Sequence, residues 1–162
     1  MAEQIVIPAT TDRAERYRAL MPQMGALLAG ESDPIAAMAN FSAALQQMFQ
    51  WHWTGFYRVA GEVLLLGPFQ GPVACSTVPY GKGVCGTAWA QDRIVTVADV
   101  DQFPGHIACS AASRSEIVVP VHGRSGRVAA VLDVDSVVRG DFGLVDERGL
   151  AELCGLIEPL LP

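Results

Sequence analysis

Hydrophobic positions near the N-terminus repeat with a helical period. Between residues 11 and 29, one face carries all the large apolar residues, and Gly30 ends the pattern. These residues are Tyr17, Leu20, Met24, Leu27 and Leu28. Pro22 lies midway and removes a backbone donor, so the pattern predicts a helix that breaks or bends there.

The clearest helix is predicted over residues 31–49. Asp33 is a favourable N-cap residue, and Pro34 suits the first helical position. The apolar stripe of this segment consists of Ile35, Met38, Phe41, Leu45, Met48 and Phe49. The N-terminal part of the chain, about 11–49, is therefore expected to be helical.

After residue 50 the period changes to that of strands. Segments 53–59 and 62–69 predict a hairpin joined by a short turn. Further strands are predicted over 93–100, 115–123 and 126–136, followed by a closing helix over about 142–158. This order predicts one α+β domain over 1–162, an antiparallel sheet with helices packed on one face.

Two loops are longer than ordinary connections, which favours a functional role for both. They cover residues 70–90 and 99–115, and a short helix is predicted from Gly86 to Gln91. Three of the four cysteines lie in these loops: Cys75, Cys85 and Cys109.

Composition narrows the function. The chain has 162 residues, 51% of them hydrophobic, which is enough for a sizeable core. A net charge of -6 with only 11 Lys and Arg residues argues against a nucleic-acid partner and against an anionic membrane surface. The N-terminal residues do not follow a signal-peptide pattern, and no apolar run is long enough for a membrane span, so a cytoplasmic protein is expected.

The cysteines are the first candidates for chemistry. Cys154 lies on the apolar face of the last helix and is expected to be core. For the three loop cysteines, redox chemistry is favoured over zinc, because nine residues separate Cys75 from Cys85 and only His106 and Cys109 have a ligand-like spacing. A redox thiolate needs a second cysteine that can reach it in space.

Acidic and aromatic residues suggest a pocket. Asp133 and Asp135 alternate on one strand and share a face, and Glu116 begins another strand. Neighbouring carboxylates repel unless a cation or a shared proton lies between them, but taken alone this pair of aspartates favours a solvated strand end before a turn. Trp53 and Tyr57 also share a face, either in the core or as the wall of a pocket.

Several motifs together resemble one family. They are, in order, "WTGFYRV", "LLLGPFQGPVAC", "GKGVCGTAWAQ", "DVDQFPGHIACSAASRSEIVVPV" and "AAVLDVDS". These segments resemble free methionine-R-sulfoxide reductases, a family of single GAF domains, and the resemblance covers nearly the whole chain. It implies a central antiparallel sheet, helices packed on it and a cavity roofed by loops.

The resemblance also implies an activity. The substrate would be free L-methionine (R)-sulfoxide, with thioredoxin as the reductant and with no metal or organic cofactor. Cys109 matches the nucleophile, Cys75 the resolving cysteine that forms a disulfide with it, and Cys85 the third cysteine. A homodimer is compatible with such a domain, but no sequence feature indicates one.

The polar positions carry over in the same way. Glu116, Asp133 and Asp135 match the acidic groups of the pocket, and Trp53 matches its aromatic wall. The chain departs from the family pattern at Ser110, where Asp is usual, and in segment 137–146, which is less acidic than expected. A GAF sensor without catalytic activity, and a thiol redox switch or zinc module, are the competing interpretations.

Overall fold

A computed structural model describes residues 4–107 and 109–162. Six antiparallel strands form one sheet in the order β3-β2-β1-β6-β5-β4. The strands are β1 (Trp53–Ala60), β2 (Val63–Gln70), β3 (Thr77–Pro79), β4 (Val95–Val97), β5 (Ser115–His122) and β6 (Val128–Ser136). The helices are α1 (Arg13–Leu28), α2 (Pro34–Phe49), α3 (Gly83–Gln91) and α4 (Leu144–Ile157), with short 3₁₀ turns η1 (Val100–Gln102) and η2 (Glu158–Leu160). The predicted α+β class is confirmed.

The two N-terminal helices begin at side-chain caps. Asp12 accepts a hydrogen bond from the backbone of Glu15, and Asp33 accepts one from the backbone of Ala36. The prediction for the start of α2 is therefore confirmed. The prediction of a break at Pro22 is wrong, because α1 runs through this residue as one continuous helix.

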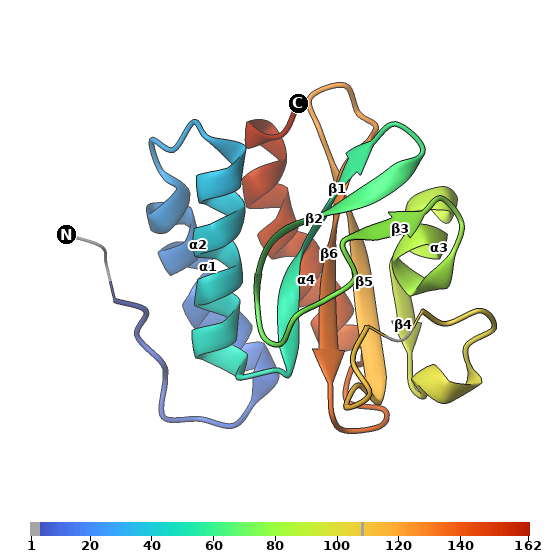
Figure 1. Ribbon diagram of the computed structural model, residues 1–162. Coiled ribbons are helices and arrows are strands. Elements are labelled where there is room, and N and C mark those ends of the chain that lie inside the picture. The colour runs from blue at the N-terminus through green and yellow to red at the C-terminus, as the bar shows by residue number, and fades with distance from the viewer. Residues whose placement is uncertain (1–3, 108) are drawn as a thin grey trace.

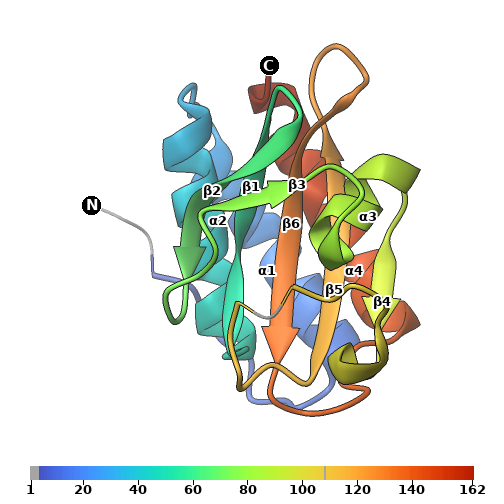
Figure 2. The same ribbon diagram turned by 45° about the vertical axis from the view of Figure 1, so that its right-hand side comes forward.

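Helices lie on both faces of the sheet (Figure 1). On one face, α1, α2 and α4 pack on alternate strand residues such as Phe56, Ile117 and Leu132. On the other face, α3 packs on Tyr57, Val118 and their neighbours (Figure 2). The prediction that all helices share one face is thus wrong for α3. β5 and β6 are buried on both faces, so each face needs a cover.

Short elements differ most from the prediction. β3 has three residues and was not predicted, and β4 also has three where a strand over 93–100 was expected. α3 begins at Gly83, three residues before the predicted start. Among the described residues, no helix combines the length and apolarity needed to cross a bilayer.

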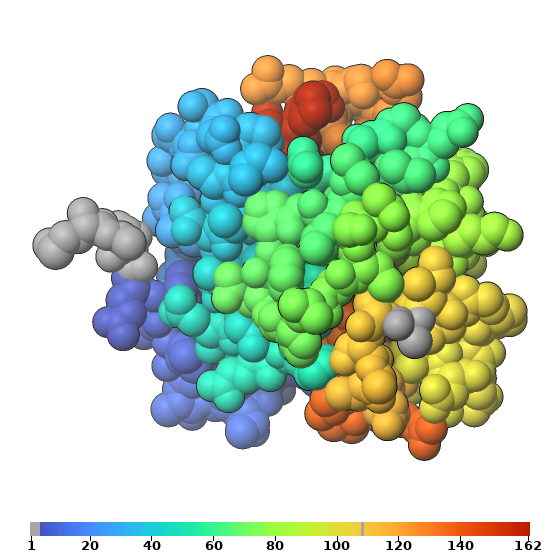
Figure 3. Space-filling model, in the orientation of Figure 1, coloured from blue at the N-terminus to red at the C-terminus, as the bar shows by residue number. Residues whose placement is uncertain are grey.

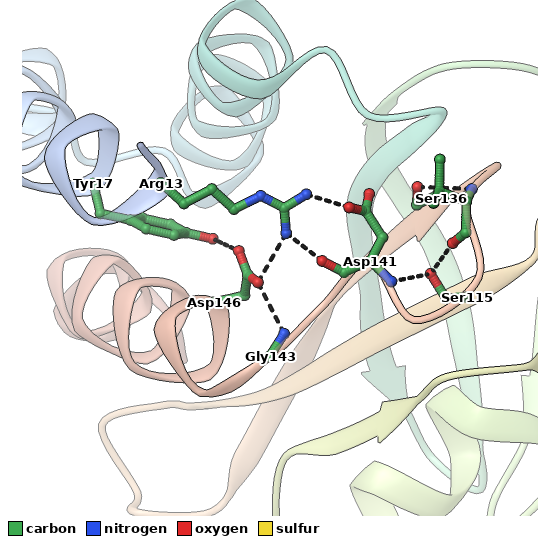
Figure 4. A network of polar contacts seen from close by, with 8 residues as sticks. Arg13, Tyr17, Ser115, Ser136, Asp141, Gly143 and Asp146 are labelled. Atoms are coloured by element: carbon green, nitrogen blue, oxygen red, sulfur yellow. Dashed lines mark hydrogen bonds and ion pairs between the residues drawn. The ribbon is translucent and has the colours of Figure 1, made fainter. Parts of the chain in front are cut away.

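A polar network connects α1 with the segment between β6 and α4 (Figure 4). The carboxylate of Asp146 is 2% exposed and accepts hydrogen bonds from the Arg13 guanidinium (2.9 Å), the Tyr17 hydroxyl (3.0 Å) and the Gly143 backbone N–H (2.9 Å). Arg13 also pairs with Asp141. Burial alone would lower the pKa of Arg13, but the two aspartates raise it above its usual value.

The same network reaches the ends of two central strands. The backbone N–H of Asp141 donates to the Ser115 hydroxyl, which donates to the carbonyl of Val138 (2.6 Å). The backbone N–H of Val138 donates to the Ser136 hydroxyl (3.1 Å). Segment 137–143 is thus attached to both strand ends (Figure 4).

We expect Arg13→Met to lower the free energy of unfolding by about 2–3 kcal/mol, because it leaves the Asp146 carboxylate buried without its cation. Urea unfolding at neutral pH measures this. Arg18→Met in the same helix is the matched control, since Arg18 forms no ion pair in the described part of the chain. Equal losses in the two variants would contradict the role of the ion pair.

Candidate active site

The register of the central strands places the acidic residues side by side. Asp135 of β6 lies opposite Trp53 of β1 and opposite Glu116 of β5. One pleat further along β6, Asp133 lies opposite Gly55 and Val118. Because side chains alternate along a strand, this row and the next point to the face that α3 covers.

α3 covers the acidic residues on this face of the sheet. It places the thiol of Cys85 3.9 Å from Oε1 of Glu116. One donor atom each from Cys85, Glu116 and Asp133 lies within 4.8 Å of the other two. Glu116 is 6% exposed and Asp133 is 7% exposed, so the interpretation of Asp133 as a solvated strand end is wrong.

Burial changes the protonation of this cluster. Burial, and then the charge of Asp135, raises the pKa of Glu116 well above its usual value. Burial and the Glu116 carboxylate do the same to the pKa of Asp133. Burial raises the pKa of Asp135 to about 6, against the opposing effects of Ser113 and His106. The site can therefore hold a neutral carboxyl group next to an ionised one at neutral pH.

The Cys85 thiol is free but protonated. Burial, and then the Asp133 and Glu116 carboxylates, raises its pKa well above the usual value. A thiol in this state is a poor nucleophile. Cys85 therefore lies at the acidic end of the site without being activated there.

A disulfide joins the two segments that cover the site. Cys75 precedes β3 and Cys109 precedes β5, and their Cα atoms are 5.4 Å apart. The pairing implied by the family resemblance is therefore present in the structure. Around this disulfide, the residues after β2 and those before β5 meet on the surface (Figure 3).

Aromatic residues of β1 hold one covering segment in place. The Trp53 indole N–H donates to the carbonyl of Pro72 (3.1 Å), and the Tyr57 hydroxyl donates to the carbonyl of Cys75 (3.0 Å). Both rings also line the cavity below. Trp53 and Tyr57 thus form part of the cavity wall and also hold the covering segment in place.

The enclosed cavity has a volume of about 40 Å³. Its lining includes Cys109 and the Cys85 thiol, the aromatic pair and all three acidic residues that the sequence singled out. Cys75 is not among the lining residues, but its disulfide joins it to Cys109, which is. The structure therefore brings every predicted site residue to one place.

Two histidines are in positions that the sequence did not reveal. The sequence indicates only a ligand-like spacing between His106 and Cys109, whereas in the structure Nε2 of His106 lies 3.6 Å from Oε2 of Glu116. His52 was not considered, and its Nε2 lies 2.9 Å from the hydroxyl of Ser110. Fifty-eight residues separate His52 from Ser110, so no local spacing signals this contact.

The comparisons with known proteins agree with this geometry. The GAF domain family matches residues 9–161. GAF domain-containing protein A of Dictyostelium discoideum is 46% identical over 98% of this chain and 99% of its own length. The free methionine-R-sulfoxide reductase of Escherichia coli is 44% identical over 93% of this chain and 91% of its own length.

A solved structure is similar over nearly the whole fold. It is the free methionine-R-sulfoxide reductase of Neisseria meningitidis in complex with its substrate, 45% identical, with a TM-score of 0.91 over 96% of this chain and 94% of that one. This chain belongs to the free methionine-R-sulfoxide reductase family of GAF domains. The fold and the family implied by the sequence motifs are thus confirmed.

Ser110 also helps to position the loop before β5. This residue follows Cys109 directly, and its contact with His52 attaches the loop to the residue that precedes β1.

Gly55 provides a test of how tightly the aromatic wall is packed. A Cβ at this position would lie 2.3 Å from Cβ of Phe69 and 2.7 Å from Cη2 of Trp53. We expect Gly55→Ala to lower the free energy of unfolding by about 1–3 kcal/mol and to displace the indole. Urea unfolding followed by tryptophan fluorescence measures both effects.

Gly25→Ala is the matched control for this substitution. No atom lies within 4 Å of a Cβ built at Gly25, and the residue is inside α1. Alanine there should raise the free energy of unfolding by about 0.5–1 kcal/mol. A Gly55→Ala protein as stable as the wild type would show that the wall has room to adjust.

Proposed function

We propose that this protein reduces free L-methionine (R)-sulfoxide to methionine by thiol chemistry at Cys109. The observation that carries the proposal is the Cys75–Cys109 disulfide at the edge of a cavity with three carboxyl groups. Family membership supports the same reaction, because relatives with this name are 44% and 34% identical to the chain. Reduction at sulfur by cysteine requires only thiols and a proton source.

In the first step, the Cys109 thiolate attacks the sulfoxide sulfur. The sulfoxide oxygen takes up a proton and is transferred to Cys109: its bond to the methionine sulfur breaks and a bond to the Cys109 sulfur forms. Methionine leaves as the thioether, reduced by the two electrons that Cys109 loses when it becomes a sulfenic acid. In the second step, the Cys75 thiol attacks the Cys109 sulfur, a disulfide forms and water is released. Cys109 is exposed in the disulfide form, which suits its exchange with an external dithiol.

Glu116 and Asp133 are the proposed proton source. A sulfoxide is a poor electrophile until its oxygen is protonated, and a neutral carboxyl group is the donor required. Burial and mutual repulsion favour one retained proton on this pair at neutral pH. His106, 3.6 Å from Glu116, can return a proton from the cavity edge after each turnover.

Asp135 is the proposed partner of the substrate ammonium group. Its pKa of about 6 leaves it ionised at neutral pH, whereas the Glu116–Asp133 pair retains a proton. Backbone N–H groups at the start of α3, where Gly83 and Val84 line the cavity, suit the substrate carboxylate. A site that holds both charged ends selects the free amino acid, because a peptide-linked residue would leave its polar groups unpaired.

Thioredoxin is the proposed reductant of the Cys75–Cys109 disulfide. Its dithiol would attack one sulfur of the bridge and leave with both sulfurs oxidised, which restores two thiols here. Cys85 is the proposed third thiol, which would enter exchange when the covering segments open; its position in the lining of the same cavity as Cys109 supports this role.

The direct test is NADPH consumption with thioredoxin, thioredoxin reductase and each sulfoxide epimer separately. We expect turnover of the free R epimer only. Cys109→Ser should abolish it, because no sulfenic acid can form, and Cys75→Ser should stop the reaction near one turnover. Cys154→Ala is the matched control, since this cysteine is buried on the opposite face of the sheet. A Cys109→Ser protein with wild-type turnover would overturn the proposal.

The pH dependence tests Asp135 separately. Because the pKa of Asp135 is about 6, its charge is present above that pH and is lost as the pH falls through it. We expect KM for the sulfoxide to rise, and kcat/KM to fall up to about tenfold per pH unit, below about pH 6. Steady-state kinetics across about pH 5–8 measure this.

Asp135→Asn identifies the titrating group. This variant should have a high KM at every pH, and its kcat/KM should no longer fall below about pH 6. If kcat/KM of Asp135→Asn still falls below about pH 6 as in the wild type, the titration belongs to another group.

A further inference from the structure

The cluster formed by Cys85, Glu116 and Asp133 has an oxygen that nothing in the described chain satisfies. Asp133 is 7% exposed, and its Oδ1 has no hydrogen-bond partner among residues 4–107 and 109–162. Buried carboxylate oxygens are almost always paired, so an unpaired one indicates a missing ligand. The proton chemistry proposed above does not require a thiol at this end of the cavity.

The donor atoms are arranged nearly as a small metal ion requires. The Cys85 sulfur and Oε1 of Glu116 are 3.9 Å apart, and all three donor atoms lie within 4.8 Å of one another. A tetrahedral zinc ion, with a Zn–S bond of about 2.3 Å and a Zn–O bond of about 2.0 Å, holds sulfur and oxygen ligands about 3.5 Å apart. Small side-chain rotations are sufficient to close the difference.

The chemistry of the three groups selects the metal class. Binding of the ion would displace the proton of the Cys85 thiol and any proton on Glu116 and Asp133, which leaves one thiolate and two carboxylates with three negative charges. Their burial favours a divalent cation that neutralises most of this charge. The thiolate favours zinc over magnesium or calcium, which prefer oxygen ligands only. The fourth coordination position faces the cavity, whose volume of about 40 Å³ has room for water.

A route to the cluster exists at the surface. Val73 lines the same cavity and is 87% exposed, so the cavity reaches solvent beside the disulfide. We infer that Cys85, Glu116 and Asp133 form a binding site for zinc or a similar soft divalent cation within this cavity. If the proposed function holds, an ion in this position excludes the sulfoxide and inhibits turnover.

The disulfide makes the site separable from the reactive cysteines. When Cys75 and Cys109 are joined, neither can offer a thiolate, and the remaining thiols are Cys85 and Cys154. Cys154 lies in the core on the opposite face of the sheet. Any thiolate–metal bond in the disulfide form therefore belongs to one of two cysteines that substitution can distinguish.

The experiment titrates the disulfide form with Co²⁺ and follows thiolate-to-cobalt charge-transfer absorption, then displaces Co²⁺ with Zn²⁺. We expect one ion per chain, no response to Mg²⁺ and an unchanged spectrum in Cys154→Ala. In Cys85→Ser the charge-transfer band should disappear. Its zinc affinity should fall more than about 100-fold, because loss of an outer-shell partner alone costs 10–100-fold.

Asp133→Asn is a second variant that keeps the thiol. Its charge-transfer band should persist with weaker binding, and circular dichroism should confirm that both variants are folded. Absence of a thiolate band in the disulfide form, or a band lost in Cys154→Ala and not in Cys85→Ser, would overturn the inference. The spectrum does not depend on turnover, so an inactive protein would refute the proposed function and leave this result unaffected.

Discussion

The antiparallel register of β1, β6 and β5 is the constraint on which the site depends. It sets Trp53, Asp135 and Glu116 in one row across the sheet and Asp133 in the next. A slip of one residue would turn the carboxyl groups into the apolar layer beneath α1, α2 and α4. The hydrophobic alternation of these strands therefore stabilises the fold and aligns the acidic groups at the same time.

The two faces of the sheet have different roles: one carries the larger apolar core and the other carries the candidate site. The three-helix face carries the larger apolar cluster, and its packing offsets the cost of the buried carboxyl groups on the other side. The α3 face is a smaller cluster that includes the aromatic wall and the Cys85 thiol. The Arg13 network joins the two, since it extends from α1 to the serines next to Glu116 and Asp135 (Figure 4).

Long periodic segments could be predicted from the sequence, and short ones could not. α2 and the β1–β2 hairpin were predicted nearly to the residue, because each has a cap or a clear period. β3 and β4 have three residues each, too few for a period, and tertiary pairing creates them. In the site, residue types pointed to the correct members, but the contacts of His106 with Glu116 and of His52 with Ser110 arise only from folding.

The Cys75–Cys109 bridge spans 34 positions of the chain, and β3, α3 and β4 all lie between its ends. Closing a loop of this length removes conformational freedom from the unfolded chain that corresponds to about 4 kcal/mol. In the proposed cycle, each turnover would convert this fifth of the domain from an open chain to a closed ring and back. The redox state of the protein would then also set its resistance to proteases and its lifetime. The oxidised form, whose disulfide has not yet been reduced, would be the more durable one.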